Sequence, residues 1–440
     1  MKKIFATIVV LSMMATIMKG QNFDKAKMDK FFDAIEQNDR GMGSISIFYD
    51  GKEVYQRSIG FADIQHGLKA EAETRYRIGS ISKTFTAAII MQMVDEGKLT
   101  LDTKLSQFYP DAPNATKITI EQLLRHRSGL FNFTNAENYL EWHTKSHSKA
   151  EMLTKIKANG AVFEPDEKAD YSNTNYILLA YIAEKIDRTD FAAILQTRIV
   201  QKNRLANTKY GGKINYKGGE ALSYNLVEDW EVEPETDMSI PSGAGAVIST
   251  PTDINAFYHA LQTGKIVSDS SLKLMNKRVD DYGMGLFELP FYDKTSMGHT
   301  GGIDGFESMA SYFPNEKVGI AYVSNGVVFP VNDIMLGALS IYFGKKYDIP
   351  VFKPAFEVTS QDLDKYLGVY SKDGFPLKIT ISKKGKILVG QATGQPSFVL
   401  EAYEAHKFKF DAVGLKLQFI PEKNQMILKQ GGVNIEMEKE

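Results

Sequence analysis

Cysteine is absent from the 440 residues of this chain. Its absence excludes disulfide bonds, thiolate nucleophiles, cysteine-ligated metal sites and a lipid anchor attached to a cysteine. An excess of charge of one sign is missing too, because 52 Lys and Arg residues face 54 Asp and Glu residues, for a formal net charge of −2. Since nucleic-acid-binding domains carry a basic surface, no nucleic-acid partner is expected.

Long apolar runs are missing beyond the N-terminus, where no segment reaches the roughly 18 consecutive apolar residues of a membrane-spanning helix. At the N-terminus, Lys2 and Lys3 precede a short apolar run over residues 4–17. This order is typical of a secretory signal peptide, and the alternative is a buried N-terminal helix. We predict that residues 1–20 are the signal, and that the mature protein is periplasmic or extracellular with no stable membrane anchor.

The larger N-terminal part of the chain alternates helical and strand patterns. An amphipathic helix is predicted over residues 23–38, and a hairpin with an Asp-Gly turn over residues 43–55. Residues 137–205 have mostly helical patterns, and residues 282–325 return to strands. We therefore predict an α+β domain over residues 21–350, in which an antiparallel sheet is flanked by helices and carries an all-helical subdomain.

The pattern changes near Val351. Phe352-Lys353-Pro354 is typical of a linker, and short alternating strands separated by Gly, Asp and Asn turns follow. We predict a separate small all-β domain, a barrel or a sandwich, over residues 358–440, with no catalytic group in it. Its predicted strands cover residues 379–382, 387–389, 407–411, 415–420 and 425–429.

A serine and a lysine three residues apart form the first motif, Ser80-Ile81-Ser82-Lys83. Because a helix is predicted over residues 84–96, both side chains lie on one face, and the Lys83 ammonium can reach the Ser80 hydroxyl. Free N–H groups and the helix macrodipole favour developing negative charge at this helix start. The pair indicates an activated nucleophile, although an N-cap serine beside a solvated lysine gives the same pattern.

The second motif, Tyr171-Ser172-Asn173, follows a polar loop and precedes an apolar helix predicted over residues 176–186. A tyrosine and an asparagine two residues apart at such a junction can point into one cleft. The alternative is a packing tyrosine with a capping asparagine. A glycine-rich segment over residues 241–251 lacks the lysine of a phosphate-binding loop, so we interpret it as a site of close backbone packing.

The third motif, His299-Thr300-Gly301-Gly302, lies within the predicted strands. Glycines in a strand favour close approach of a ligand to the backbone. In order and separation, Ser80-x-x-Lys83, Tyr171-x-Asn173 and His299-Thr300-Gly301 resemble the three motifs of the class C β-lactamase and D-alanyl-D-alanine carboxypeptidase family of serine hydrolases. The resemblance covers about residues 23–347, and the C-terminal domain looks like the lipocalin-like appendages of some members. Supporting stretches lie at residues 123–130, 241–250 and 282–285.

The resemblance implies an acyl-enzyme mechanism. Ser80 would attack a carbonyl carbon, while Lys83 and the Tyr171 phenol would share its proton, each with a pKa lowered by neighbouring groups. The backbone N–H groups of Ser80 and Gly302 would form the oxyanion hole. The substrate-binding residues would be Asn173, His299, Thr300, Gly301 and Gly302.

His299 departs from the pattern of many β-lactamases, which have lysine at this position. Asn173 would orient the substrate amide, and His299 with Thr300 would face its carboxylate or polar tail, unless an arginine elsewhere holds that carboxylate. Members with histidine here include D-alanyl-D-alanine peptidases, D-amino-acid peptidases and esterases. The expected function is therefore an exported D-amino-acid peptidase, carboxypeptidase or esterase. The alternatives are a class C-like β-lactamase and a slowly deacylating penicillin- or peptidoglycan-binding sensor.

Two other enzyme classes have weaker support. A Ser-His-Asp hydrolase with a nucleophile elbow is disfavoured because no Gly-x-Ser-x-Gly occurs. His143 and His147 are four residues apart on a predicted helix, but no Glu follows His143 as in His-Glu-x-x-His, so a solvated helix face is the favoured interpretation. No metal and no cofactor are expected, and the partner would be a small-molecule or peptide substrate, with peptidoglycan-derived peptides among the candidates.

Overall fold

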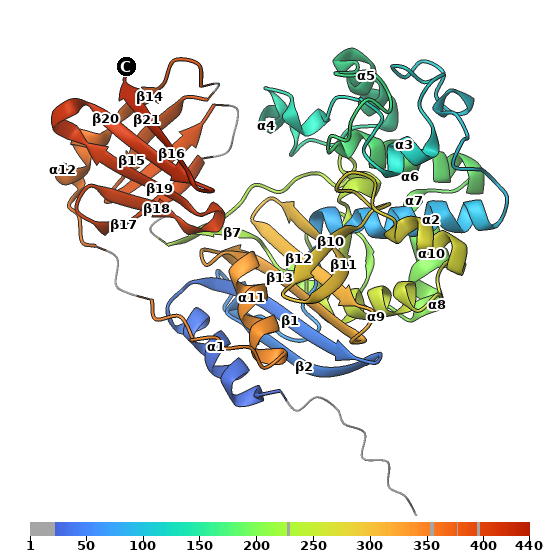
Figure 1. Ribbon diagram of the computed structural model, residues 1–440, viewed down its shortest axis with the longest axis horizontal. Coiled ribbons are helices and arrows are strands. Elements are labelled where there is room, and N and C mark those ends of the chain that lie inside the picture. The colour runs from blue at the N-terminus through green and yellow to red at the C-terminus, as the bar shows by residue number, and fades with distance from the viewer. Residues whose placement is uncertain (1–22, 227–228, 353–355, 376, 394–396) are drawn as a thin grey trace, which may run out of the picture.

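The computed structural model describes residues 23–226, 229–352, 356–375, 377–393 and 397–440. The predicted signal at residues 1–20 lies outside them. Two parts are visible in Figure 1: a larger body of helices around a sheet, and a β-barrel built by the end of the chain. Among the described residues, no helix is long and apolar enough to cross a membrane.

One antiparallel sheet of six strands forms the centre of the larger body, in the order β10-β11-β12-β13-β1-β2. The predicted hairpin is confirmed: it turns at Asp50 and Gly51, whose φ angles of 47° and 77° are those of a tight hairpin turn. The strands are β1 (Gly41–Tyr49), β2 (Lys52–Ile59), β10 (Phe287–Phe291), β11 (Lys294–Ile303), β12 (Phe306–Phe313) and β13 (Val318–Val327).

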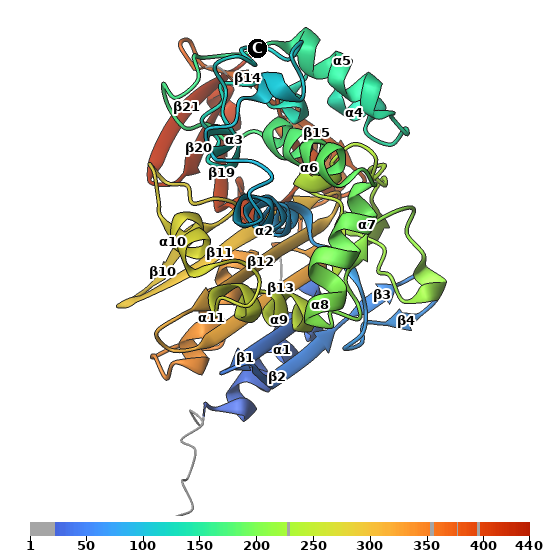
Figure 2. The ribbon, with the colours of Figure 1, turned by 90° about the vertical axis from the view of Figure 1, so that its right-hand side faces the viewer.

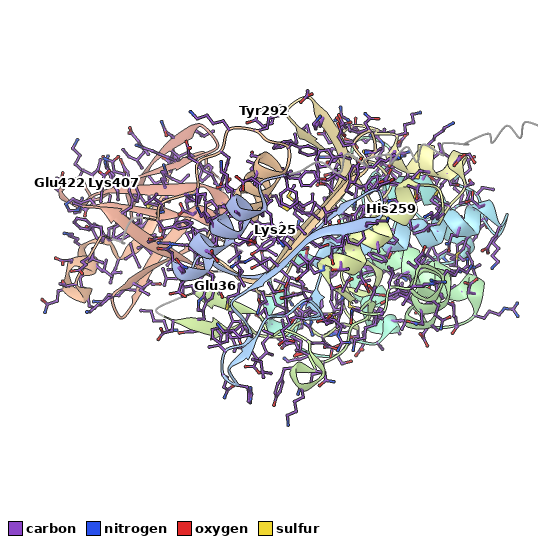
Figure 3. The ribbon with its side chains drawn as sticks, turned by 90° about the horizontal axis from the view of Figure 1, so that it is seen from below. Lys25, Glu36, His259, Tyr292, Lys407 and Glu422 are labelled. Atoms are coloured by element: carbon purple, nitrogen blue, oxygen red, sulfur yellow. The ribbon has the colours of Figure 1, made fainter. Side chains whose placement is uncertain are left out.

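Helices cover both faces of this sheet. On one face, α1 (Lys25–Gln37) and α11 (Val331–Tyr342) pack an aromatic-rich core against Ile45 and Ile47. On the other, α9 (Pro251–Gln262) crosses β1, β12 and β13. In Figure 3, Lys25 and Glu36 mark α1, and His259 marks α9 across the strands. The predicted sheet flanked by helices is therefore confirmed.

Helix α2 (Ser82–Asp95) separates the sheet from the all-helical subdomain, with α6 (Asn173–Asp187) above it in Figure 2. Its residues from Ser82 to Met91 are all buried, including the polar side chains of Ser82, Lys83, Thr84 and Thr86. The remaining helices of this part are α3 (Ile120–Leu124), α4 (Tyr139–Trp142), α5 (Lys149–Asn159), α7 (Phe191–Leu195), α8 (Gln201–Asn203) and α10 (Asp269–Asn276).

Seven short strands among the described residues belong to the larger body in addition to the six-stranded sheet. They form three small sheets, with the orders β3-β4, β5-β9-β6 and β7-β8. Their bounds are β3 (Phe61–Asp63), β4 (Leu68–Lys69), β5 (Tyr76–Arg77), β6 (Lys209–Tyr210), β7 (Tyr224–Leu226), β8 (Trp230–Val232) and β9 (Val247–Ser249).

The C-terminal strands close into an antiparallel barrel, which decides between the barrel and the sandwich left open above. Sequence patterns missed β14, β17 and β21, and β21 closes the barrel by pairing with β14. A short helix, α12 (Ser360–Leu363), precedes the barrel. Its strands are β14 (Gly368–Ser371), β15 (Ile379–Lys384), β16 (Ile387–Ala392), β17 (Ser397–Glu404), β18 (Lys407–Phe410), β19 (Leu415–Ile420), β20 (Gln425–Gln430) and β21 (Val433–Lys439).

Candidate active site

Ser80 lies in a single 3₁₀ turn, residues 79–81, that leads into α2, so the helix begins two residues earlier than predicted. The turn requires glycine before the serine: Gly79 has a φ of +51°, and a Cβ there would lie 2.7 Å from the Gly302 backbone nitrogen. Ser80 remains partly exposed while its neighbours are buried. The sequence thus presents one hydroxyl at the start of a buried helix.

The Lys83 ammonium lies among three oxygen atoms. It donates hydrogen bonds to Ser80 Oγ at 2.8 Å, to Asn173 Oδ1 at 2.7 Å and to the Ala244 carbonyl oxygen at 2.8 Å. The first contact lies within the first motif, and the second joins the first motif to the second. The third comes from the glycine-rich segment 241–251, whose carbonyl no side-chain pattern could have identified.

Burial lowers the pKa of Lys83 well below its usual range, because its side chain has no solvent contact and no carboxylate partner. A charged ammonium donates to all three oxygens. A neutral amine can donate to two of them and accept the Ser80 proton. The hydrogen-bond geometry therefore suits both the ammonium and the neutral amine. A catalytic base needs both forms because it takes a proton and later returns it.

Asn173 is held in one orientation by the loop after α3. Its backbone N–H and its Nδ2 both donate to Asn132 Oδ1, at 3.0 and 3.2 Å, and Nδ2 also donates to Thr134 Oγ1 at 3.2 Å. With Nδ2 fixed by these acceptors, Oδ1 points to Lys83. Asn132 and Thr134 are site residues that the sequence analysis missed, because they belong to no motif.

The Tyr171 ring lies against the same ammonium, with its centroid 4.9 Å from Lys83 Nζ. Burial raises the pKa of the Tyr171 phenol, and the neighbouring Ser80 hydroxyl offsets only part of this effect. The expectation of a lowered pKa therefore holds for Lys83 and is wrong for Tyr171 in the free protein. The reason is desolvation, which disfavours both the phenolate and the ammonium.

The third motif lies on β11, at an edge that β10 leaves open. The last pair of β10 with β11 joins Phe287 to Gly298, and the residues after Gly298 pair with β12 alone. A Cβ at Gly301 would lie 2.2 Å from the Ile78 carbonyl oxygen and 3.0 Å from the Ser80 nitrogen. The glycines therefore allow β11 to touch the Ser80 turn, which brings the backbones of Ser80 and Gly302 together.

His299 is buried at 2% exposure, and its ring packs 4.5 Å from that of Phe287. Its Nδ1–H donates to the Thr300 carbonyl oxygen at 2.5 Å. Burial, followed by the nearby Lys83 charge, lowers the pKa of His299 to about 3. The imidazole is therefore neutral near pH 7 and does not replace the lysine cation found at this position in many β-lactamases. The exposed Thr300 and Gly302 remain accessible to substrate.

Arg77 is the arginine nearest in sequence to this site, and its charge is already paired. Its guanidinium is 2% exposed and forms ion pairs with Asp304 at 2.8 Å and Glu235 at 2.9 Å. Two carbonyl oxygens, of Thr236 and Gly212, accept further hydrogen bonds from it. Arg77 therefore holds the segment before Ser80 to the one after the third motif, and its carboxylate partners leave it unsuited to bind a substrate anion.

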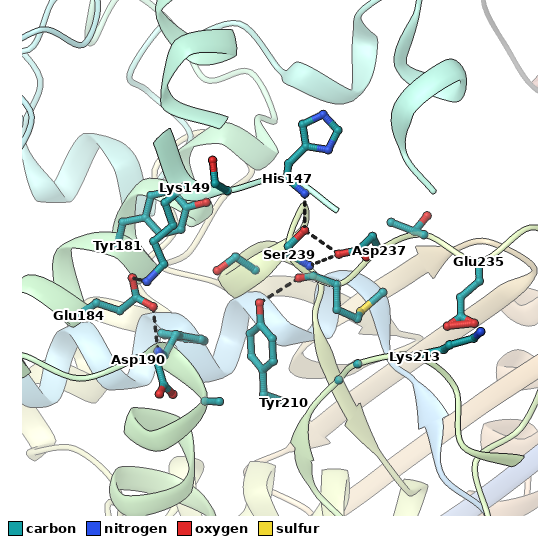
Figure 4. Close-up of a pocket in the computed structure, with 18 of the residues that line it drawn as sticks. His147, Lys149, Tyr181, Glu184, Asp190, Tyr210, Lys213, Glu235, Asp237 and Ser239 are labelled. Atoms are coloured by element: carbon teal, nitrogen blue, oxygen red, sulfur yellow. Dashed lines mark hydrogen bonds and ion pairs between the residues drawn. The ribbon is translucent and has the colours of Figure 1, made fainter. Parts of the chain in front are cut away.

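A cavity of about 690 Å³, lined by both polar and apolar side chains, lies between α5, α6 and residues 235–239 (Figure 4). Lys149 and Glu184 form an ion pair of 2.6 Å on its wall, and Ser239 Oγ accepts from the His147 backbone at 2.9 Å. None of the predicted site residues lines it. The cavity is therefore separate from the catalytic groups.

The two histidines of the metal alternative both contact backbone carbonyl groups. His143 Nδ1 and His147 Nδ1 contact the backbone carbonyls of Leu140 and Lys145, at 2.9 and 2.8 Å. Over the part of the chain that the structure describes, no group of three or more His, Asp or Glu residues is arranged to hold a metal ion.

Comparison with known proteins identifies the class. The profile of the Beta-lactamase family matches residues 27–339, and the chain belongs to this family of serine β-lactamase-related hydrolases. The resemblance inferred from the three motifs is thereby confirmed, and the protein is an enzyme of the serine hydrolase class.

Particular relatives are distant. Penicillin-binding protein 4* of Bacillus subtilis (strain 168) is 25% identical over 89% of this chain and 93% of its own length. Teichoic acid D-alanine hydrolase of Staphylococcus aureus (strain MRSA252) is 23% identical over 68% of this chain and 73% of its own. The crystal structure of D-amino acid amidase from Ochrobactrum anthropi SV3 has a TM-score of 0.66 at 22% identity, over 72% of this chain and 98% of the amidase. This last likeness shows the fold.

Proposed function

We propose that this protein is an exported hydrolase that forms an acyl-enzyme on Ser80 and cleaves small amides or esters of D-amino acids. The observation that carries the proposal is the 2.8 Å hydrogen bond between Lys83 Nζ and Ser80 Oγ at the start of a buried helix. Export is supported by the pattern of residues 1–20 and by relatives named for penicillin binding and teichoic acid hydrolysis.

The first half of the reaction is acylation. Ser80 Oγ attacks the substrate carbonyl carbon while its proton passes to neutral Lys83, and the oxyanion accepts hydrogen bonds from the backbone N–H groups of Ser80 and Gly302. Such a donor contributes about 10²–10³ in rate. Tyr171, neutral because its phenol is buried, passes a proton to the leaving amine or alcohol. The Lys83 ammonium then returns a proton to the Tyr171 phenolate.

The second half repeats these steps with water. Water attacks the acyl-enzyme carbonyl while Lys83 takes a proton from it. Lys83 then returns this proton to Ser80 Oγ as the acyl group leaves. Asn173, whose amide protons are taken by Asn132 and Thr134, would accept a hydrogen bond from the substrate amide through the remaining lone pair of Oδ1.

Neutral His299 and the paired Arg77 favour substrates whose leaving part carries no anion. Activated esters and D-aminoacyl amides should therefore turn over faster than a cephalosporin, and β-lactams should acylate Ser80 and leave slowly. Peptidoglycan-derived peptides are substrate candidates through their D-amino-acid amide bonds, and the carboxylate on a C-terminal leaving residue places them below uncharged amides and esters.

The test of the nucleophile is adduct mapping. A fluorophosphonate or a penicillin is incubated with the mature protein, and mass spectrometry of the digest locates the adduct. We expect it on Ser80, and we expect Ser80→Ala to abolish both adduct and turnover. An adduct on another serine, or undiminished turnover by Ser80→Ala, would overturn the proposal.

The test of substrate class compares kcat/KM for a chromogenic cephalosporin, a short ester, a D-alanyl amide and a D-Ala-D-Ala peptide in the wild type and in His299→Lys. We expect the ester and the D-alanyl amide to lead in the wild type, and the cephalosporin to gain in the variant. Fast cephalosporin turnover that the substitution leaves unchanged contradicts the ranking. Stable adducts without turnover of any substrate point to the sensor alternative.

A further inference from the structure

His126 lies in the stretch 123–130 that links α3 to the loop before Asn132, and it contacts Asp170 and the first two residues of the second motif. Its backbone carbonyl accepts a hydrogen bond from the Asp170 N–H at 2.9 Å. Its ring stacks on that of Tyr171, with centroids 4.4 Å apart and planes at 29°. Its Nδ1 accepts a hydrogen bond from the Ser172 N–H at 3.1 Å.

The backbone conformation of His126 is compatible with these three contacts. His126 has a φ of +57°, a left-handed conformation that histidine and asparagine tolerate better than most side chains. The residue is 2% exposed, and the rings of Tyr176 and Tyr282 enclose it at 5.2 and 5.1 Å. The imidazole therefore has one orientation, in which a ring face and an acceptor nitrogen point to adjacent residues.

We propose that His126 is a positioning residue, which fixes the phenol of Tyr171 beside Ser80 and Lys83 by holding residues 170, 171 and 172 at once. Tyr171 comes just before Ser172, the residue at the N-cap of α6, and its phenol lies beside the Ser80 hydroxyl. The aromatic ring that carries this phenol is held by packing, so the His126 ring against it and the fixed Ser172 peptide decide where the phenol oxygen lies. The proposal rests on the proposed function in one respect, the role of Tyr171 in proton transfer.

The charges around His126 preserve the contact. Because Nδ1 accepts the Ser172 N–H, the ring must be neutral, with its proton on Nε2. Burial, followed by the charge of Lys83 and by neighbouring His299, lowers the pKa of His126 well below its usual range. The acceptor therefore persists across the pH range in which a hydrolase of this kind is assayed.

The test measures the second-order rate constant for phosphonylation of Ser80 by a fluorophosphonate, in which Oγ bonds to phosphorus and fluoride leaves, in the full-length mature protein. His126→Ala removes ring and acceptor, and we expect a loss of about 10²-fold, the typical effect of a misplaced catalytic group. His126→Asn keeps the left-handed backbone and places an amide oxygen near the Nδ1 position, so we expect it to recover about tenfold of that loss. Leu123→Ala is the matched control, because it removes a buried side chain from the same stretch and leaves both contacts in place.

A double-mutant cycle with Tyr171→Phe separates positioning from damage to the fold. If His126 acts through Tyr171, then His126→Ala slows the wild type but changes the rate of Tyr171→Phe by less than about twofold, whereas Leu123→Ala has the same effect in both backgrounds. Full multiplication of the two losses, or a wild-type rate in His126→Ala, overturns the positioning role. An unchanged rate in Tyr171→Phe alone instead overturns the proposed role of Tyr171. Should His126→Ala be insoluble, His126→Asn replaces it in the cycle with the same criteria.

Discussion

The larger body and the C-terminal barrel bury different kinds of side chain. In the larger body, Arg77, Lys83, His126 and His299 are each at most 2% exposed. In the described part of the barrel, the buried side chains are aliphatic, aromatic or methionine, including Leu417 and Met426 at 0%, and none of them is a lysine, arginine, histidine or carboxylate. A buried ionisable group lowers the free energy of unfolding unless hydrogen bonds or ion pairs replace its lost hydration. The buried Lys, Arg and His side chains therefore make the larger body less stable than an apolar core of the same size would be.

This difference indicates where chemistry is performed. Desolvation lowers the pKa of Lys83 and of both histidines, and it raises the pKa of the Tyr171 phenol. These four groups lie in and around the Ser80 site, as expected at a catalytic site. The described residues of the barrel include no buried lysine or histidine. The following predictions test this contrast, in order of decreasing expected effect.

Lys83→Met should give the largest effect and should leave the barrel unchanged. Removing the base that shares the Ser80 proton should lower the acylation rate by about 10²–10⁴. The measurement is fluorophosphonate labelling of the variant, with hydrogen exchange of barrel peptides followed in parallel. Altered exchange in β19 or β20 would contradict the separation of the two regions.

Leu417→Ala should give the reverse result. Deleting a fully buried side chain from the barrel core should destabilise the barrel by about 2–5 kcal/mol through lost burial and an unfilled cavity. Hydrogen exchange in the barrel should rise while the acylation rate of Ser80 stays at the wild-type value. The exposed neighbour Lys416 offers the control, because Lys416→Ala should change neither quantity. A large loss of acylation in Leu417→Ala would show that the barrel helps to build the site.

Acid should destabilise the larger body through its buried histidines. The pKa of His299 is about 3 in the folded protein and about 6.5 when unfolded, so between these values the unfolded state binds more protons. Stability therefore rises with pH across this window and falls on acidification, by about 3 kcal/mol at pH 4.5 for this residue. Urea unfolding at pH 4.5 and pH 7.5 measures the change, which should shrink in His299→Gln. An equal pH dependence in this variant would show that His299 does not titrate as described.

The ion pairs between the two regions should give the smallest effects. Arg40 and Glu401 form a bidentate pair at 2.7 and 3.0 Å, with side chains 15% and 20% exposed. Lys384 and Glu231 form a pair whose side chains are 57% and 50% exposed. We expect Arg40→Ala to increase hydrogen exchange in β17 by an amount equivalent to about 1 kcal/mol, and Lys384→Ala to change it less, because water and salt screen exposed pairs. The opposite order would show that the Lys384 pair governs docking.

The sequence alone determined the local features of this protein. Hydrophobic periodicity and turn residues predicted the first hairpin, α1, α2 and most barrel strands, because these patterns depend on neighbours a few positions apart. The three motifs also identified Ser80, Lys83 and Asn173, which the structure brings within hydrogen-bond distance. Short polar motifs carry such information because their chemistry requires particular residue types.

Tertiary structure decided the features that depend on what surrounds each residue. The Ala244 carbonyl reaches Lys83 from 161 positions away, and Asn132 reaches Asn173 from 41 positions away. Neither contact has a side-chain signature, since one acceptor is backbone and the other an ordinary loop asparagine. The pairing of β14 with β21, which closes the barrel, likewise joins distant segments. The sign of the Tyr171 pKa shift follows from burial, which depends on the folded chain as a whole: desolvation outweighs the lowering effect of the Ser80 hydroxyl.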